Sequence, residues 1–277
     1  MTEIFKKLNR ICCETQGLTS PEKALRFNEF RNEPISISHT RHLLVKSGMR
    51  SYSARKKPIL TKASIKKRFR FAKQFINYTE EDWRQFIFSD EAYFEINLNT
   101  IMNRVRRFRC TDPFASKFVK KTCKHPLKVM VWGCFSYYGV GEIIICDGNM
   151  NTEKYIETLQ NHLLPSIRNL GIDNPYHLDD SAPCRRSLIV KNWHRQIEIR
   201  KIDWPGNSPD MNPIENLWAI IKYKLKRKKI LNKQNLVREI ENIWNNEISL
   251  ECCQSLSNSM VSRIASLKKS KGKSTKY

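Results

Sequence analysis

The spacing of hydrophobic residues changes along the chain from a purely helical pattern to a mixed one. Before residue 50, apolar side chains recur at helical spacing in three short stretches, Glu3–Thr15, Ser20–Phe30 and Ser38–Ser47, the last with Ser38 as its expected N-cap. Short helices joined by tight turns are typical of a helix-turn-helix module. A small helical packing module would give the same pattern, so the spacing alone leaves both interpretations open.

From Trp83 onward, apolar runs alternate with amphipathic stretches. We expect strands at Gln85–Ile96, Asn103–Arg109, Lys128–Ser136, Gly141–Cys146, Tyr176–Asp180 and Ile197–Asp203. We expect helices from Thr61, at Asn151–Leu170 with Thr152 as cap, at Cys184–Gln196, from Pro213, at Asn232–Asn246 and at Leu250–Leu267. This order predicts an α/β fold with a mixed sheet flanked by helices.

A loop of turn-forming residues leads into a helix that carries an acid in its first turn. Asn212 is the expected N-cap and Pro213 the first helical residue, which puts Glu215 at the third helical position. The ordinary role of such a carboxylate is a capping box with the Asn212 N–H. Lys222 and Lys226 follow Glu215 on the same stripe of the helix, and an acid followed by cations suits a metal ion beside a phosphate backbone.

Two further acids come at the ends of apolar runs. Asp90 ends the run that begins at Gln85, and Asp180 ends the strand predicted from Tyr176. Acids in this position reach the edge of a sheet, where ligands bind in α/β folds. Metal-assisted phosphodiester chemistry needs several carboxylates that meet in space. Between Asp180 and Glu215 there are 34 residues.

The spacing of these acids, and four motifs in order around them, resemble the mariner-superfamily transposases, the Tc-like branch especially. The motifs are Phe88-Ser89-Asp90-Glu91, Val129-Met130-Val131-Trp132-Gly133, Asp180-Ser181-Ala182-Pro183-Cys184 and the stretch from Ser208 to Trp218. The resemblance is strong from about Arg55 to the end and weaker before it. Ser181 stands where the family usually has Asn, Arg185 where it has His, and Pro126-Leu127-Lys128 where a glycine-rich run is common.

The resemblance implies a ribonuclease-H-like catalytic domain that binds Mg²⁺ or Mn²⁺ through Asp90, Asp180 and Glu215. It further implies a cut-and-paste DNA transposase, which hydrolyses phosphodiester bonds at inverted-repeat ends and transfers the strands into target DNA, commonly at TA. The implied partner is double-stranded DNA, bound by a homodimer in the nucleus. The family normally carries a further helix-turn-helix and a Gly-Arg-Pro linker upstream, so we expect an N-terminally shortened form.

Two other functions are compatible with the same residues. A catalytically decayed or repurposed transposase would bind DNA without cutting it, and metal-dependent nicking would separate it from the enzyme. A general ribonuclease-H-like nuclease would share the metal site but would show no preference for inverted-repeat ends.

The charge of the chain supports a polyanionic partner. The formal net charge is +23, and residues 1–80 hold 18 Lys and Arg against 6 Asp and Glu. A charge of this size argues for nucleic acid. The residues expected to contact DNA are His39, Arg41, His42 and Lys46 of the third helix, in the major groove, and Arg55, Lys56, Lys57, Lys222 and Lys226, at phosphates.

The cysteines and the apolar runs narrow the class of protein further. Nine cysteines include no Cys-x-x-Cys motif, so neither a zinc ribbon nor a redox motif is supported, and we expect a reducing, intracellular setting. No apolar run approaches the roughly 20 residues needed to span a membrane. We expect a helix-turn-helix domain at 1–50, a basic linker and helix at 51–80, the catalytic domain at 81–267 and a disordered basic tail at 268–277.

The adjacent acids Asp179 and Asp180 cannot both face a metal if their strand is regular, because successive side chains point to opposite faces. The distance in sequence to Glu215 and the match to the family motif favour Asp180. We therefore expect Asp180 to be the ligand and Asp179 to be a neighbour that adds negative potential.

Overall fold

The computed structural model describes residues 3–14, 18–50, 57–95, 111–112, 115, 128–148, 150–180, 185, 187–228 and 230–277. The chain forms two compact units, Met1–Lys57 and Pro58–Tyr277. Among the described residues, no helix combines the length and the apolar character that crossing a bilayer requires.

The first unit contains three helices, α1 (Glu3–Glu14), α2 (Ser20–Asn28) and α3 (Ile37–Lys46). Leu8, Ile11 and Phe27 form its small core. The Asn28 side chain bonds both the N–H and the carbonyl of Ile35 at 3.0 Å, which fixes the turn between α2 and α3. The predicted cap of α3 was wrong by two positions, because the hydroxyl of Ser36 accepts the His39 N–H at 3.1 Å.

The second unit is built on a five-stranded mixed sheet in the order β3-β2-β1-β4-β5. The strands are β1 (Phe86–Glu95), β2 (Lys128–Ser136), β3 (Gly139–Cys146), β4 (Tyr176–Leu178) and β5 (Arg200–Lys201). The pairs β1–β2 and β2–β3 are antiparallel, whereas β1–β4 and β4–β5 are parallel. This is the predicted ribonuclease-H-like arrangement, with β4 and β5 shorter than expected. The strand expected at 103–109 lies outside the described residues.

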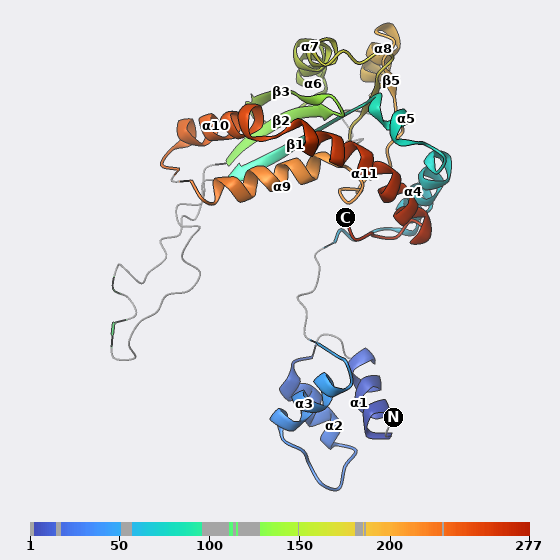
Figure 1. Ribbon diagram of the computed structural model, residues 1–277, viewed down its shortest axis with the longest axis vertical. Helices are drawn as coiled ribbons and strands as arrows, with labels where there is room; N and C mark the ends of the chain where they lie inside the picture. Colours follow the sequence, from blue (N-terminus) through green and yellow to red (C-terminus); the bar gives the residue numbers. More distant parts are fainter. Residues whose placement is uncertain are drawn as a thin grey trace. The chain divides into compact units, whose positions relative to one another are not determined.

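Helices cover both faces of this sheet, as Figure 1 shows. The helices of the unit are α4 (Lys62–Phe75), α5 (Glu80–Arg84), α6 (Thr152–Thr158), α7 (Leu164–Asn169), α8 (Leu188–Gln196), α9 (Ile214–Leu225), α10 (Lys233–Asn242) and α11 (Leu250–Lys269). Two π-helical turns, Leu159–Leu163 and Ile243–Glu247, adjoin α7 and α10. Phe86 and Phe88 of β1 pack into the core shared with α4, α9, α10 and α11, whereas Ile87 packs into the core shared with α6, α7 and α8.

Two predicted helices differ from the structure at their starts. The helix expected at Asn151–Leu170 is divided, and Asn151 rather than Thr152 caps it. Pro165 has no N–H to continue a regular ladder, and directly before it the turn widens, with the Leu164 N–H bonded to the Leu159 carbonyl. Helix α8 begins at residue 188 and not at 184, because the Ser187 hydroxyl accepts the Val190 N–H.

The basic tail is ordered, contrary to the expectation of disorder. The backbone N–H and the hydroxyl of Thr275 both donate to Asp210 Oδ2 at 2.9 Å. The carbonyl of Gly272 accepts a hydrogen bond from Arg68 Nε, also at 2.9 Å. Helix α4 does not belong to a linker as predicted, because it carries Arg68 and packs against α11 inside the second unit.

Candidate active site

The register of two parallel strands brings the first two acids together. Phe88 of β1 pairs with Leu178 of β4. Asp90 and Asp180 each follow two residues after this pair, so the register alone places them at the same level of neighbouring chain segments. Asp90 lies inside β1 and is buried, whereas Asp180 comes after β4 and keeps 48% of its side chain exposed.

Alternation along β1 decides which helix Asp90 faces. Phe86, Phe88, Ala92 and Phe94 all belong to the core that α9 shares, and Asp90 stands at the same parity. Helix α9 is fixed against this face, since Trp218 meets Phe94 edge to face with ring centroids 6.0 Å apart. The N-terminal end of α9 therefore belongs to the same side of the sheet as the Asp90 carboxylate.

Glu215 occupies the second position of α9, one place earlier than predicted, because Pro213 is the N-cap. Its carboxylate makes no hydrogen bond to the Asn212 N–H in the described part of the chain, so the ordinary capping-box role is not used here. Burial raises the pKa of Glu215, Lys222 opposes the rise, and the charge of Asp180 adds to it. Glu215, Asp180 and Lys222 therefore share one electrostatic environment.

Asp90 is the most deeply buried of the three acids, with 7% exposure. Burial raises its pKa well above the usual range, and the Arg185 guanidinium opposes this rise. The charges of Asp180 and Glu215 raise the pKa further. A cation placed among these acids would relieve both the desolvation of Asp90 and the repulsion between the carboxylates.

Asp179 and Asp180 have different surroundings. Asp179 is fully buried, and its Oδ2 accepts hydrogen bonds from the Tyr155 hydroxyl at 2.6 Å and from Lys201 Nζ at 2.8 Å. Burial would raise the pKa of Asp179, but Lys201, His177 and Tyr155 together lower it. Asp180 instead lies 2.6 Å from Arg185 Nη1. Asp179 is therefore paired inside the protein, but its charge still raises the pKa of Asp90, as expected of a neighbour that adds negative potential. Asp180 is the acid whose charge raises the pKa of both Asp90 and Glu215.

Sequence reasoning missed two members of this cluster, Arg185 and Glu91. Arg185 is 4% exposed, forms a close ion pair with Glu91, and places Nη1 3.9 Å from Asp90 Oδ1. The departure from the family pattern at Arg185 was a signal that this position is unusual. No local pattern could show its contact with Glu91, which comes from the chain folding back across the sheet.

The donors present suit a hard divalent cation, because Mg²⁺ and Mn²⁺ prefer carboxylate oxygens. Glu91 Oε1 is a buried carboxylate oxygen with no hydrogen-bond partner in the described structure. Among the described residues, however, no three His, Cys, Asp or Glu side chains are grouped so that they could hold a metal ion as they stand. The carboxylates are therefore of the kind that binds Mg²⁺ or Mn²⁺. In this structure the positive charge among them is the guanidinium of Arg185.

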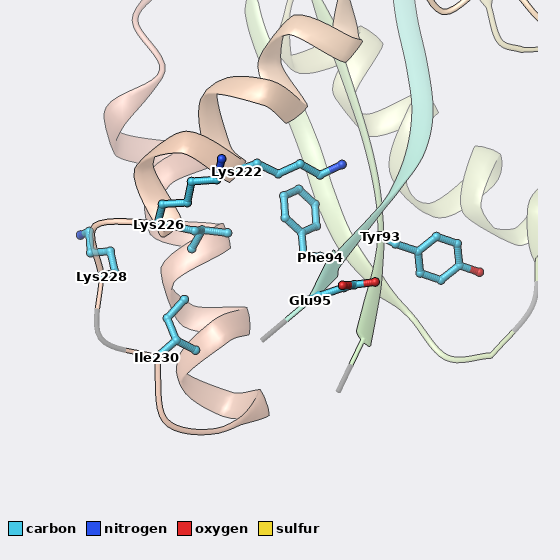
Figure 2. A pocket seen from close by; sticks show the side chains of 8 residues that line it. Tyr93, Phe94, Glu95, Lys222, Lys226, Lys228 and Ile230 are labelled. Carbon is cyan, nitrogen blue, oxygen red and sulfur yellow. The ribbon is translucent and has the colours of Figure 1, made fainter. Parts of the chain in front are cut away.

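A basic groove lies between the end of β1 and the end of α9 (Figure 2). Its lining consists of Tyr93, Phe94, Glu95, Lys222, Leu225, Lys226, Lys228 and Ile230. Lys222 extends over the Phe94 ring with its Nζ 5.5 Å from the centroid, as Figure 2 also shows. Both lysines that the sequence suggested for phosphate contact, Lys222 and Lys226, line this groove.

The predicted DNA-contacting residues of the first unit lie on α3 and its flank. His39, Arg41, His42 and Lys46 are all exposed, and only Thr40 of α3 is buried. They are therefore available to a partner. Arg55 and Lys56 fall outside the described residues, and Lys57 is half-buried.

Comparisons with known proteins agree with this arrangement. Residues 85–237 match the family described as DDE superfamily endonuclease, and residues 10–77 match a helix-turn-helix family described as transposase. The chain is 31% identical over 275 residues to the transposable element Tcb1 transposase of Caenorhabditis briggsae, which covers 98% of this chain and 99% of the relative. It is 29% identical over 249 residues to the Tc1 transposase of Caenorhabditis elegans, which covers 89% and 90% respectively.

The fold also matches a solved structure. A Mos1 transposase in a paired-end complex with the left transposon end superimposes with a TM-score of 0.82, over 98% of this chain and 80% of that one, at 14% identity. The match to an endonuclease family favours a transposase over a DNA-binding remnant. This chain belongs to the Tc1/mariner family of cut-and-paste DNA transposases, which are metal-dependent enzymes with a DDE endonuclease domain.

Proposed function

We propose that Asp90, Asp180 and Glu215 are the ligands of catalytic Mg²⁺ or Mn²⁺ in this transposase. The observation that carries this assignment is the β1–β4 register, which sets Asp90 beside Asp180 on the side where α9 presents Glu215. Mos1 transposase, which shares the fold, has been solved with Mn and with Mg. Bound divalent ions would activate a water or a DNA 3′-hydroxyl and stabilise the leaving 3′-oxygen.

The protein's own residues would hold the substrate against these acids. Lys222 and Lys226 would neutralise phosphates along the groove, and Lys222 already opposes the rise that burial causes in the pKa of Glu215. The packing of β1 against α9 keeps Asp90 away from water. The attraction between its carboxylate and a bound cation would therefore be only weakly screened. Exchange of phosphodiester bonds requires no nucleotide cofactor.

The proposed DNA substrate is double-stranded, and it carries the inverted repeats of the element and a TA target. Mos1 structures include a paired-end complex and a strand transfer complex, which supports a homodimer assembled on two transposon ends. The exposed face of α3 would read sequence through His39, Arg41, His42 and Lys46, while Arg55, Lys56 and Lys57 would contact phosphates. We place this activity in the nucleus, where the DNA of the element resides.

One cleavage experiment tests the proposal. The full chain is incubated with DNA that carries the flanking inverted repeats, with Mg²⁺, with Mn²⁺ or with chelator. Asp90→Asn, Asp180→Asn and Glu215→Gln should each abolish metal-dependent cleavage and leave DNA affinity within about twofold, because the acids serve the metal and the basic residues serve phosphate. Asp203→Asn, a change at an exposed acid outside the cluster, is the matched control and should cleave normally.

Three outcomes distinguish the alternatives. Nicking that survives one of the substitutions removes that residue from the site. Binding without any metal-dependent cleavage by the unaltered chain would identify a DNA-binding protein derived from a transposase. Cleavage that ignores the inverted repeats would identify a general nuclease.

A further inference from the structure

Arg185 places a buried positive charge among the acids that we assign to the metal. Its guanidinium pairs with Glu91, lies 2.6 Å from Asp180 Oδ1, and approaches Asp90 Oδ1 at 3.9 Å. Only 4% of its surface is exposed. Burying a guanidinium costs free energy unless neighbouring acids compensate its charge. The acids of this cluster therefore stabilise Arg185 in its buried position.

The rest of the molecule holds Arg185 in this position. The carbonyl of Arg185 accepts a hydrogen bond from Lys201 Nζ at 2.8 Å, and the guanidinium carbon lies 5.3 Å from the centroid of the Tyr155 ring. Lys201 and Tyr155 also donate to Asp179. The same two side chains therefore support Arg185 and neutralise Asp179, which leaves Asp90, Glu91 and Asp180 as the acids that face the guanidinium.

The guanidinium and a divalent ion would require the same oxygen. Oδ1 of Asp180, which we assign as a ligand, is already in contact with Arg185 Nη1. A divalent ion held by that oxygen would stand close to the nitrogen, and the two positive charges would repel each other.

We propose that Arg185 is a resident counter-cation, which holds the acid cluster together before metal binds and competes with the divalent ion for Asp180. With an ion bound, the guanidinium would leave Asp180, while its ion pair with Glu91 would keep it in the site. Arg185 is thus a positioning residue that lowers the affinity for metal. The inference rests on the proposed function, because it takes Asp90, Asp180 and Glu215 as the ligands.

Binding of Mn²⁺ to the full chain without DNA tests this, with free Mn²⁺ measured by electron paramagnetic resonance. Arg185→Gln should bind Mn²⁺ about tenfold or more tightly than the unaltered chain, since one competing charge is removed from the ligand shell. Arg200→Gln is the matched control, because it removes the same charge from an exposed arginine that contacts Tyr176 and not the acids. Its Mn²⁺ affinity should equal that of the unaltered chain.

Thermal unfolding provides a second measurement on the same proteins. In chelator, Arg185→Gln should unfold at a lower temperature than the unaltered chain. Added Mn²⁺ should raise the unfolding temperature of Arg185→Gln by more than it raises that of the unaltered chain. If Arg185→Gln does not fold, Arg185→Lys decides the question. A lysine keeps the charge but cannot span Glu91 and Asp180 together, so Mn²⁺ should bind more tightly than to the unaltered chain.

The outcomes separate this inference from the proposed function. Equal or weaker Mn²⁺ binding by Arg185→Gln, together with loss of binding in Asp180→Asn, overturns the competition and leaves the metal site in place. Absence of Mn²⁺ binding in every protein overturns the metal site and the inference with it.

Discussion

His177 and His194 form a buried hydrogen-bonded chain beside the acid cluster. His194 Nδ1 lies 2.8 Å from the Val190 carbonyl and must donate to it, so the neutral His194 ring accepts at Nε2. His177 Nδ1 lies 3.1 Å from that nitrogen and donates to it, which leaves His177 Nε2 to accept from the Ser89 hydroxyl at 2.8 Å. Each hydrogen bond thus fixes the next, and a further proton on His194 Nε2 would set it against the Nδ1–H of His177.

This chain predicts a loss of stability in mild acid. Burial lowers the pKa of His177 to about 3 and also lowers the pKa of His194, whereas both rings titrate normally near 6.5 once unfolded. The unfolded state therefore takes up protons that the folded state refuses, and stability falls as the pH drops from above 6.5 toward 3. Between pH 7 and pH 5, His177 alone should cost roughly 2 kcal/mol, measured by denaturant unfolding.

A variant that removes the titrating group provides the control. His177→Gln can still accept from Ser89 but takes up no proton, so its stability should fall less over the same pH interval. Identical pH profiles for the variant and the unaltered chain would show that His177 is not the group responsible.

The adjacent acids Asp179 and Asp180 should respond to substitution in opposite ways. Asp179→Ala leaves the largely buried Lys201 without its carboxylate partner, and breaking such a pair costs roughly 3 kcal/mol of unfolding free energy. Asp180→Ala removes a half-exposed side chain and should change stability by less than about 1 kcal/mol, yet it should abolish Mn²⁺ binding. Unfolding and Mn²⁺ titration of both variants check this, and a reversed pattern would mean that Asp179 is the ligand.

At the scale of elements, the loop before α9 is held by helices distant in sequence. Arg68 of α4 binds both carboxylate oxygens of Asp210, at 2.9 and 2.8 Å. Arg263 of α11 donates to the Asp210 carbonyl at 2.9 Å and to the Asn216 side chain at 2.6 Å. Since Glu215 directly precedes Asn216, these arginines fix the start of the helix that carries the third acid.

Gly272 is the point at which the C-terminal segment passes over α4. Its φ is +83°, and a Cβ there would lie 2.2 Å from the Ile65 carbonyl oxygen. Gly272→Ala should therefore lower the unfolding free energy by about 2 kcal/mol or more, because backbone must move. Gly171→Ala is the control, since Gly171 also has a positive φ, +62°, but nothing within 4 Å of an added Cβ. It should cost only about 1 kcal/mol of strain, and equal effects would exclude the close approach.

These elements show which features a sequence can predict. Strand β2 was predicted with its observed bounds, Lys128–Ser136, and β1 within one residue at each end, because alternation and apolar runs are local signals. The predicted caps of α3, α6 and α9 were wrong by one or two positions, because neighbouring side chains compete for the same N–H groups. The Arg68–Asp210 pair spans 142 residues and the Arg185 contacts depend on strand register, so no local pattern contains either of them.

At the scale of the whole molecule, the net charge of +23 predicts a steep salt dependence of DNA binding. Each phosphate neutralised releases counterions and contributes about 0.9 to the slope of log affinity against log salt. A protein that contacts six or more phosphates should lose roughly a thousandfold in affinity between 50 and 200 mM salt, measured by fluorescence anisotropy with labelled duplex. A flat dependence would show that the charge is not used for nucleic acid.

Two lysines of the basic groove differ in whether an acid of the protein already neutralises their charge. The Nζ of Lys228 lies 2.9 Å from Glu239 and 3.6 Å from Glu247, whereas Lys222 extends over the Phe94 ring and forms no ion pair in the described structure. Lys222→Ala should lower affinity for all duplexes alike and reduce the salt slope by about one. Lys228→Ala should change the slope much less, because its charge is compensated inside the protein before DNA arrives. Equal changes in slope for the two variants would mean that position in the groove, and not internal pairing, decides which lysines meet phosphate.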